Sequence, residues 1–275
     1  MTTTIDTINA NYELAPASPV RNPAIRRALK AEWTKLRTLP STWRTVVMAV
    51  TMSIGLGAVL CISQADQWAS MTAQERQGFD PTACSLGGFF LGAVLLGALG
   101  IRAVTAEYST GMIRSTFIAT PTRNLVLSAK AAVTAAFVFP LALMADVISF
   151  ELGQVIFTSK HLQVSFGHAG VLQALVFGAL GVSFVALIGV GLGGLVRHTA
   201  GSTTALALLI VGGVTLGQLL PAGVRQYLPG TALEAAVTVN HSAGLLMPGA
   251  AIAVVGIYAA IFLAAGSVRV ARGDA

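Results

Sequence analysis

Apolar residues gather in this chain into six long, uninterrupted runs, and polar residues lie between the runs. A bilayer core about 30 Å thick is crossed by roughly 20 residues of α-helix, so each run is long enough to span a membrane. Strands of a membrane barrel would instead alternate apolar and polar residues over about ten positions, which this pattern excludes. The predicted fold class is therefore all-α, an integral membrane bundle of six helices. The runs cover residues 45–63, 85–104, 125–150, 171–196, 203–220 and 249–270.

The residues before the first run divide into two parts. Residues 1–23 are polar and contain three prolines, so we expect a disordered tail. Residues 24–40 have the spacing of a basic amphipathic helix, suited either to lie in the headgroup plane or to serve as a simple topology anchor. The six spans then form a third part, residues 41–275. The apolar face of the amphipathic helix would carry Ile25, Leu29, Trp33 and Leu36.

The composition agrees with a lipid environment. Only 10% of the residues are charged and 55% are hydrophobic. Soluble domains carry about 25% charged residues, so this chain has too few charges to cover a water-facing surface. Lipid is therefore the expected solvent for most of it.

The distribution of positive charge predicts the orientation of the spans. The net charge of +6 would suggest nucleic acid as a partner of a soluble protein, but here the basic residues flank apolar runs. With six spans and the N-terminus in the cytoplasm, fourteen of the 17 basic residues lie inside. We therefore expect both termini and the 105–124 loop in the cytoplasm, and no nucleic-acid partner. The three outer basic residues are Arg76, Lys160 and Arg225.

Catalytic and metal-binding motifs are missing from the sequence. It has no GxxxxGK[ST] phosphate loop, no HExxH, no CxxC and no GxSxG. His161 and His168 share one outer loop, but nothing else there supports a metal site. We expect no catalytic residue, no metal and no cofactor bound by this chain.

Asp146 is an ionisable residue well inside a predicted span, six residues after Pro140. A carboxylate beside a proline kink could mark a substrate path or a proton site. Alternatively, Asp146 could reach water at the outer interface or bond to a neighbouring helix. A proton-coupled carrier would usually have more than one such carboxylate, which favours the second interpretation.

Small residues suggest how the helices pack. Gly88 with Gly92, Gly189 with Gly193, and Gly213 with Gly217 have a spacing that lets helix backbones approach closely. Within the long, mostly uncharged outer segment 221–248, residues 231–247 could form short helices that dip into the outer leaflet and pack against the bundle.

The loop between spans two and three predicts a short helix over residues 111–119. Ser109 or Thr110 could cap its start, and Pro121 would end it. The helix would present the apolar residues Met112, Ile113, Phe117 and Ile118, together with Arg114. Exposed apolar residues on a short helix need a partner or the bilayer surface, although an ordinary connector is the alternative.

This loop resembles a known family. Residues 107–123 read EYSTGMIRSTFIATPTR, and Lys130 follows nine residues after Pro121. The pattern resembles the Glu-x3-Gly…Thr-Pro…Lys signature of permease subunits in type-2 ABC exporters. Residues 28–43, ALKAEWTKLRTLPSTW, are similar to actinobacterial members, and the resemblance extends over residues 24–275. Gly273 departs from the basic residue that these members often have there.

The resemblance implies a division of labour between this chain and a separate ATPase subunit, which would bind ATP and Mg. The 24–40 helix would be the connecting helix and the 111–119 helix the coupling helix, both resting on the ATPase. Two permeases, identical or paralogous, would form the export path in the plasma membrane. The implied coupling residues are Glu107, Gly111, Arg114, Phe117, Ile118 and Pro121. The implied connecting-helix residues are Arg26, Arg27, Lys30, Glu32, Trp33, Lys35 and Arg37.

Two other functions remain open: a stand-alone secondary carrier, and a multi-pass membrane protein that transports nothing. The sequence lacks the clustered buried charges and the paired broken helices that are typical of carriers.

Two cysteines lie at the predicted outer ends of consecutive spans. Cys61 ends the first span and Cys84 precedes the second, so a disulfide could close the outer loop on the oxidising side of the membrane. The alternative is that both are free thiols that pack as small hydrophobes.

Overall fold

The computed structural model describes residues 21–119, 123–240 and 244–272, with the side chains in these ranges except those of residues 21–24, 114, 117–119 and 123. The described part of the chain consists of helices and connecting turns without any strand, which confirms the all-α prediction. Six of its helices are long and apolar enough to cross a membrane, so this is a multi-pass membrane protein. They are Pro40–Ser70, Phe89–Ser109, Asn124–Thr158, Val171–Val196, Thr199–Gly217 and Pro248–Arg272.

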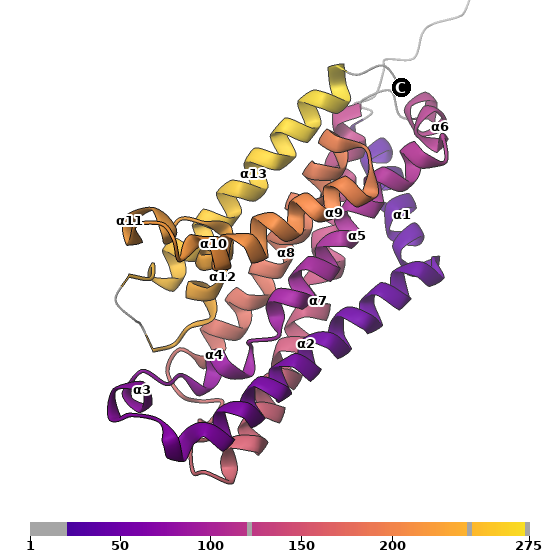
Figure 1. Ribbon diagram of the computed structural model, residues 1–275. Coiled ribbons are helices and arrows are strands. Elements are labelled where there is room, and N and C mark those ends of the chain that lie inside the picture. Colours follow the sequence, from indigo (N-terminus) through magenta and orange to yellow (C-terminus); the bar gives the residue numbers. More distant parts are fainter. Residues whose placement is uncertain (1–20, 120–122, 241–243, 273–275) are drawn as a thin grey trace, which may run out of the picture.

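Shorter helices lie between these spans. Figure 1 shows α6 and the C-terminal end of α13 at one end of the bundle, and α3 at the other. We call the first of these the α6 end. The elements in chain order are α1 (Arg21–Thr38), α2 (Pro40–Gln67), η1 (Trp68–Ser70), α3 (Ala73–Gln77), α4 (Pro81–Ser85), α5 (Phe89–Ser109), α6 (Met112–Ala119), α7 (Arg123–Thr158), α8 (Val171–Val196), α9 (Thr199–Ala207), η2 (Leu208–Gly212), α10 (Gly213–Gly217), α11 (Ala222–Arg225), α12 (Pro229–Val237) and α13 (Pro248–Arg272).

The amphipathic helix α1 and the first span meet at a proline. Pro40 occupies the first turn of α2, where its missing N–H costs nothing, and the extended Leu39 separates the two helices. Helix α1 begins at Arg21, so residues 21–23 belong to this helix rather than to the tail. The expected disorder of residues 1–20 lies outside the described residues.

Helix α8 is the centre of the bundle. In its most apolar window, 72% of the residues are buried, against 22% for the last two spans. It lies against α5 on one side and α13 on the other, and glycines make both approaches possible. A Cβ at Gly189 would lie 2.3 Å from the carbonyl oxygen of Gly97, and one at Gly191 would lie 2.4 Å from that of Phe262. These residues bear out the expected role of small side chains in helix packing.

The fifth span is irregular. Helix α9 continues through the π-helical turn η2 into α10, and the span runs from Thr199 to Gly217 rather than over residues 203–220. The turn faces α12, where a Cβ at Gly230 would lie 2.1 Å from the carbonyl oxygen of Ile210. Helix α12 is buried along most of its length. Among the described residues of the segment 221–248, α12 falls largely within the stretch expected to be helical and packs against the bundle, whereas α11 has no buried residue.

Helix α7 is the longest helix, with 36 residues, and it continues through Pro140 without a break. It therefore extends beyond the predicted span of residues 125–150. Its C-terminal part contacts α4, where Gln154 Nε2 donates to Ser85 Oγ at 3.2 Å, near the end of the bundle opposite to α6.

Asp80 ties together two segments at that opposite end. Its Oδ1 accepts hydrogen bonds from the backbone N–H groups of Thr82 and Ala83 and caps α4. Its Oδ2 accepts bonds from the N–H groups of Val239 and Asn240, at 2.6 and 2.8 Å. One carboxylate thereby fixes the loop after span one to the segment that follows α12.

The two cysteines are free thiols in the structure, so the alternative without a disulfide is the one observed. Cys61 is fully buried in α2, and its Sγ lies 3.8 Å from Ser85 Oγ. It packs with Ala65 and Phe157 as a small apolar side chain.

Candidate functional site

The short helix predicted after span two begins at a glycine turn. Gly111 has a φ of +71°, a left-handed conformation that suits glycine, and the chain there turns from α5 into α6. The hydroxyl groups of Ser109 and Thr110 both donate to the carbonyl oxygen of Ala106, at 3.1 and 2.8 Å. These side chains therefore cap the end of α5, and the expectation that they would cap α6 is wrong.

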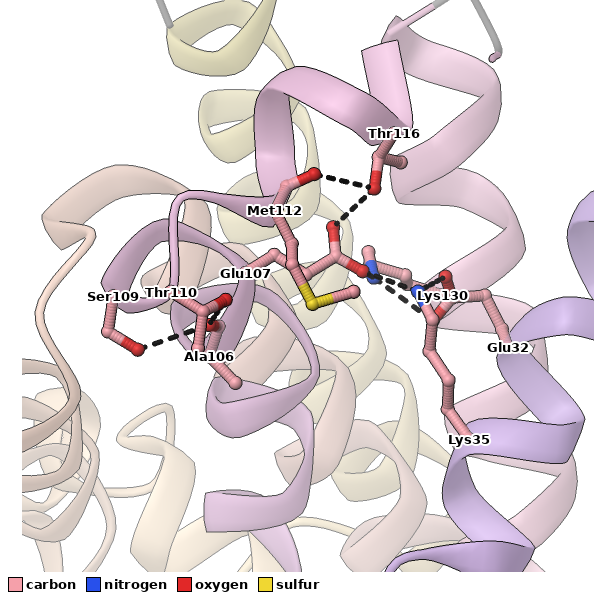
Figure 2. Close-up of polar contacts among 9 residues, drawn as sticks. All are labelled: Glu32, Lys35, Ala106, Glu107, Ser109, Thr110, Met112, Thr116 and Lys130. Atoms are coloured by element: carbon pink, nitrogen blue, oxygen red, sulfur yellow. Dashed lines mark hydrogen bonds and ion pairs between the residues drawn. The ribbon is translucent and has the colours of Figure 1, made fainter. Parts of the chain in front are cut away.

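Four charged side chains meet beside this turn, and we call them the ion-pair cluster: Glu32 and Lys35 of α1, Glu107 of α5 and Lys130 of α7. Figure 2 shows them converging from three helices. Lys130 Nζ lies 2.5 Å from Glu107 Oε1 and 3.0 Å from Glu32 Oε2. Lys35 Nζ lies 2.6 Å from Glu107 Oε1 and 2.9 Å from Glu32 Oε1. Each acid thus binds both lysines.

The ion-pair cluster is buried and electrically balanced. Only 2% of the Lys130 side chain and 7% of the Glu107 side chain are exposed. A charge this deeply buried is stable only when opposite charges and hydrogen bonds replace its water. Two acids and two lysines meet this condition within the cluster. Burial opposes the charge on Lys35, but its hydrogen bonds to Glu107 and Glu32 outweigh that effect and raise the pKa of Lys35.

Helix α6 is attached to the ion-pair cluster by a hydroxyl group. Thr116 Oγ1 lies 3.4 Å from Glu107 Oε2 and 3.2 Å from the carbonyl oxygen of Met112 (Figure 2). Ile113 is buried with 6% exposure, whereas Met112 is 51% exposed. One face of α6 is thus attached to the bundle, and Met112 is left open for contact with another surface.

Helix α1 packs onto α7 through more than charge. The Trp33 ring meets Phe137 edge-on, with 6.0 Å between the ring centroids, and Trp43 meets the same ring from α2. The other basic residues predicted for the connecting helix, Arg26, Arg27, Lys30 and Arg37, are exposed. The helix therefore has one face on the bundle and a basic face turned away from it.

The predicted coupling residues fall into two groups. Glu107 lies in the ion-pair cluster and Gly111 forms the turn before α6. The side chains of Arg114, Phe117 and Ile118 lie outside the described residues, as does Pro121, so their predicted roles stay predictions.

The pairing of Glu32 with Lys130 was missed from the sequence because 98 positions separate them. A signal was nevertheless present. Glu32 is the only acid of the 24–40 segment and Glu107 the only acid of its loop, and each lies among basic residues beside an apolar run. A lone acid in such a position favours a buried partner of opposite charge.

Asp146 lies in the packed interior, with 4% of its surface exposed, so it does not reach water at the outer interface. Its Oδ2 has no hydrogen-bond partner among the described residues. A Cβ on Gly178 of α8 would lie only 2.8 Å from that oxygen. The adjoining cavity, which Ser53 also lines, measures about 10 Å³ and holds one water at most.

The arrangement of α1, α5, α6 and α7 lies within a stretch that matches a known family. A family model described as "ABC-2 family transporter protein" matches residues 28–217, from within α1 to the end of α10. The chain belongs to the ABC-2 transporter family. The part of this ABC-2 protein that the family model matches includes all four residues of the ion-pair cluster and the turn at Gly111. No curated protein and no solved structure matches the chain.

Proposed function

We propose that this ABC-2 protein is the permease subunit of an ATP-driven exporter in the plasma membrane, and that a separate ATPase binds and hydrolyses ATP with Mg. Two such permeases, identical or paralogous, would form the path between them. This chain would contribute the path and the coupling surface and would carry out no catalysis itself.

The observation that best supports this function is the attachment of α6 to the ion-pair cluster. Helix α6 contacts Glu107 through Thr116, and Glu107 binds lysines on α1 and α7. A push on α6 from an ATPase would therefore reach α5, α7 and the amphipathic helix together. A stand-alone carrier would have no need for such an attachment of a short surface helix.

Co-purification with a candidate ABC ATPase, such as one found to be encoded by a neighbouring gene, tests the proposal. Replacing Phe117 and Ile118 by Asp should abolish the complex while membrane insertion survives, because acidic side chains would oppose an apolar docking contact. Val224→Asp, at an exposed position in α11, is the matched control and should leave the complex intact. If the complex also survives the α6 substitutions, α6 is not the coupling helix.

ATP hydrolysis by the complex then separates an exporter from a non-transporting membrane anchor. An exporter should show hydrolysis that changes when candidate compounds are added to the reconstituted complex. Transport driven by an ion gradient in the absence of any ATPase would instead establish the secondary carrier.

A further inference from the structure

A cavity of about 370 Å³ lies between α1, the first turn of α2 and the last turns of α5, and it reaches Met112 of α6. It borders the ion-pair cluster but extends well beyond it. Its volume is at the lower end of the range for small-molecule sites, which is about 300–1,000 Å³. The cavity can therefore accept part of an amphiphile, such as the region where an acyl chain joins a headgroup.

Most of the cavity wall is apolar. Leu36 and Leu39 contribute from the α1–α2 junction, Leu99 and Ala103 from α5, and Met112 from α6. Leu39 is 49% and Met112 51% exposed, so apolar side chains stand at the rim as well as inside. An apolar wall that continues to an exposed rim favours a ligand that enters from the lipid.

One side of the wall is positively charged. Arg102 lines the cavity, and the guanidinium donates to Thr45 Oγ1 at 3.4 Å. No described acid forms an ion pair with Arg102, and both acids of the wall, Glu32 and Glu107, are already bound to Lys35 and Lys130. The charge of Arg102 is thus left for a ligand.

The start of α2 adds to this positive potential. Ser41 and Thr42 line the cavity from the first turn of a 28-residue helix, and the N-cap residue Leu39 offers no side-chain hydrogen bond to that turn. The N-terminus of a helix carries a partial positive charge that attracts anions. Arg102 and the N-terminus of α2 would therefore both attract the same negatively charged group of a ligand.

The position of the cavity relative to the spans suggests where its ligand comes from. It lies where the span α2 begins and the span α5 ends, and Trp43, which is 45% exposed, stands in the same first turn of α2. Tryptophan is enriched at the level of lipid headgroups. An apolar chamber with an anion-attracting end at this level matches an amphiphile with an anionic head.

We propose that this cavity binds an anionic phospholipid of the leaflet at the α6 end, with the phosphate at Arg102 and the start of α2 and the first part of one acyl chain against Leu36, Leu99 and Ala103. The bound lipid would lie between the amphipathic helix and α5, so it would contribute to the junction from which α6 extends. This site does not depend on the proposed exporter function.

Native mass spectrometry of the detergent-purified chain, titrated with phosphatidylglycerol or phosphatidylcholine, tests the proposal. The wild type should retain phosphatidylglycerol in preference to phosphatidylcholine. Arg102→Gln should weaken phosphatidylglycerol binding about fivefold, the effect of one basic residue near an anionic lipid. Arg44 is an exposed residue near the start of α2 that does not line the cavity. Arg44→Gln removes one positive charge, as Arg102→Gln does, and it should have little effect.

A second variant tests the apolar part of the site. Ala103→Leu narrows the chamber without a change of charge and should reduce retention of the lipid, whereas Ala132→Leu, on an exposed face of α7, should not. Equal binding of the two lipids, or equal effects of Arg102→Gln and Arg44→Gln, would overturn the proposal. So would displacement of the lipid by inorganic phosphate alone, because the cavity would then be a simple anion site.

Discussion

At the scale of single residues, the main feature of this protein is a cluster of four charges, three of them buried and the fourth, Lys35, partly exposed. Glu32, Lys35, Glu107 and Lys130 neutralise one another at the place where α1, α5 and α7 meet. A buried cluster of this kind contributes little net stability compared with apolar packing, but loss of one member leaves the others uncompensated. We expect the ion-pair cluster to determine which helices meet and in what register they pack.

Lys130→Met should therefore destabilise the protein strongly. It leaves two buried carboxylates with one lysine, a change that costs about 3–5 kcal/mol in buried ion pairs. The expected result is a clear fall in the Tm of the detergent-purified chain. Lys30→Met removes the same charge from an exposed position of α1 and should leave the Tm nearly unchanged.

A double variant distinguishes lost charge balance from lost packing. Glu107→Gln combined with Lys130→Met again balances the charges and should recover part of the Tm, because an unpaired carboxylate is removed. If the double variant is as unstable as the sum of the single variants, the residues act independently and the ion-pair cluster is not a unit.

At the scale of elements, glycines decide how closely the central helix approaches its neighbours. Where α8 meets α13, the α-carbon of Gly266 approaches Gly194, and a Cβ at Gly191 would reach the backbone of Phe262. Close backbone approach gives van der Waals contact where lipid offers no hydrophobic driving force. The hydropathy of the α8 run predicted a span and the spacing of Gly189 and Gly193 predicted close packing, but only the structure shows which helices approach these glycines.

Gly191→Ala should push α8 and α13 apart. The new Cβ would lie 2.4 Å from the carbonyl carbon and oxygen of Phe262, and these are backbone atoms that cannot rotate away. We expect a destabilisation of about 1–3 kcal/mol, as for other overpacked sites, measured as a lower Tm. Gly55→Ala is the matched control, because nothing lies within 4 Å of its added Cβ. An unchanged Tm for Gly191→Ala would contradict the packing described here.

At the scale of the whole molecule, the distribution of basic residues predicts which end of the bundle faces the cytoplasm. Most of them lie in segments that the six-span arrangement places on one side, together with α1, α6 and the C-terminal end of α13. Such asymmetry sets the orientation during membrane insertion. An ATPase partner and the proposed lipid would both act at this α6 end.

Cysteine labelling of intact cells tests this orientation. In a variant without Cys61 and Cys84, a cysteine at Thr122 should be protected from a membrane-impermeant reagent. One at Thr72, in the loop after the first span, should be labelled. Labelling at Thr122 from outside would invert the arrangement and move the proposed ATPase contact to the wrong side.

The sequence by itself determined the features that depend on local composition. Six apolar runs of sufficient length predict six spans, the period of residues 24–40 predicts α1, and the segment between Thr110 and Pro121 predicts α6. The signature around Glu107 was enough to indicate the family, which the match over residues 28–217 confirms. Hydropathy and helix period are properties of neighbouring residues, so they can be read along the chain.

Only the tertiary structure decided which of these elements meet. Glu32 and Lys130 are 98 positions apart and pair because α1 lies along α7. Asp146 is enclosed by neighbouring helices rather than exposed to water, and Cys61 packs against Phe157 as a free thiol. The physical reason is that an apolar helix face in lipid can pack in many ways. The partner of a buried charge is therefore settled by shape and distance between helices, which no local pattern records.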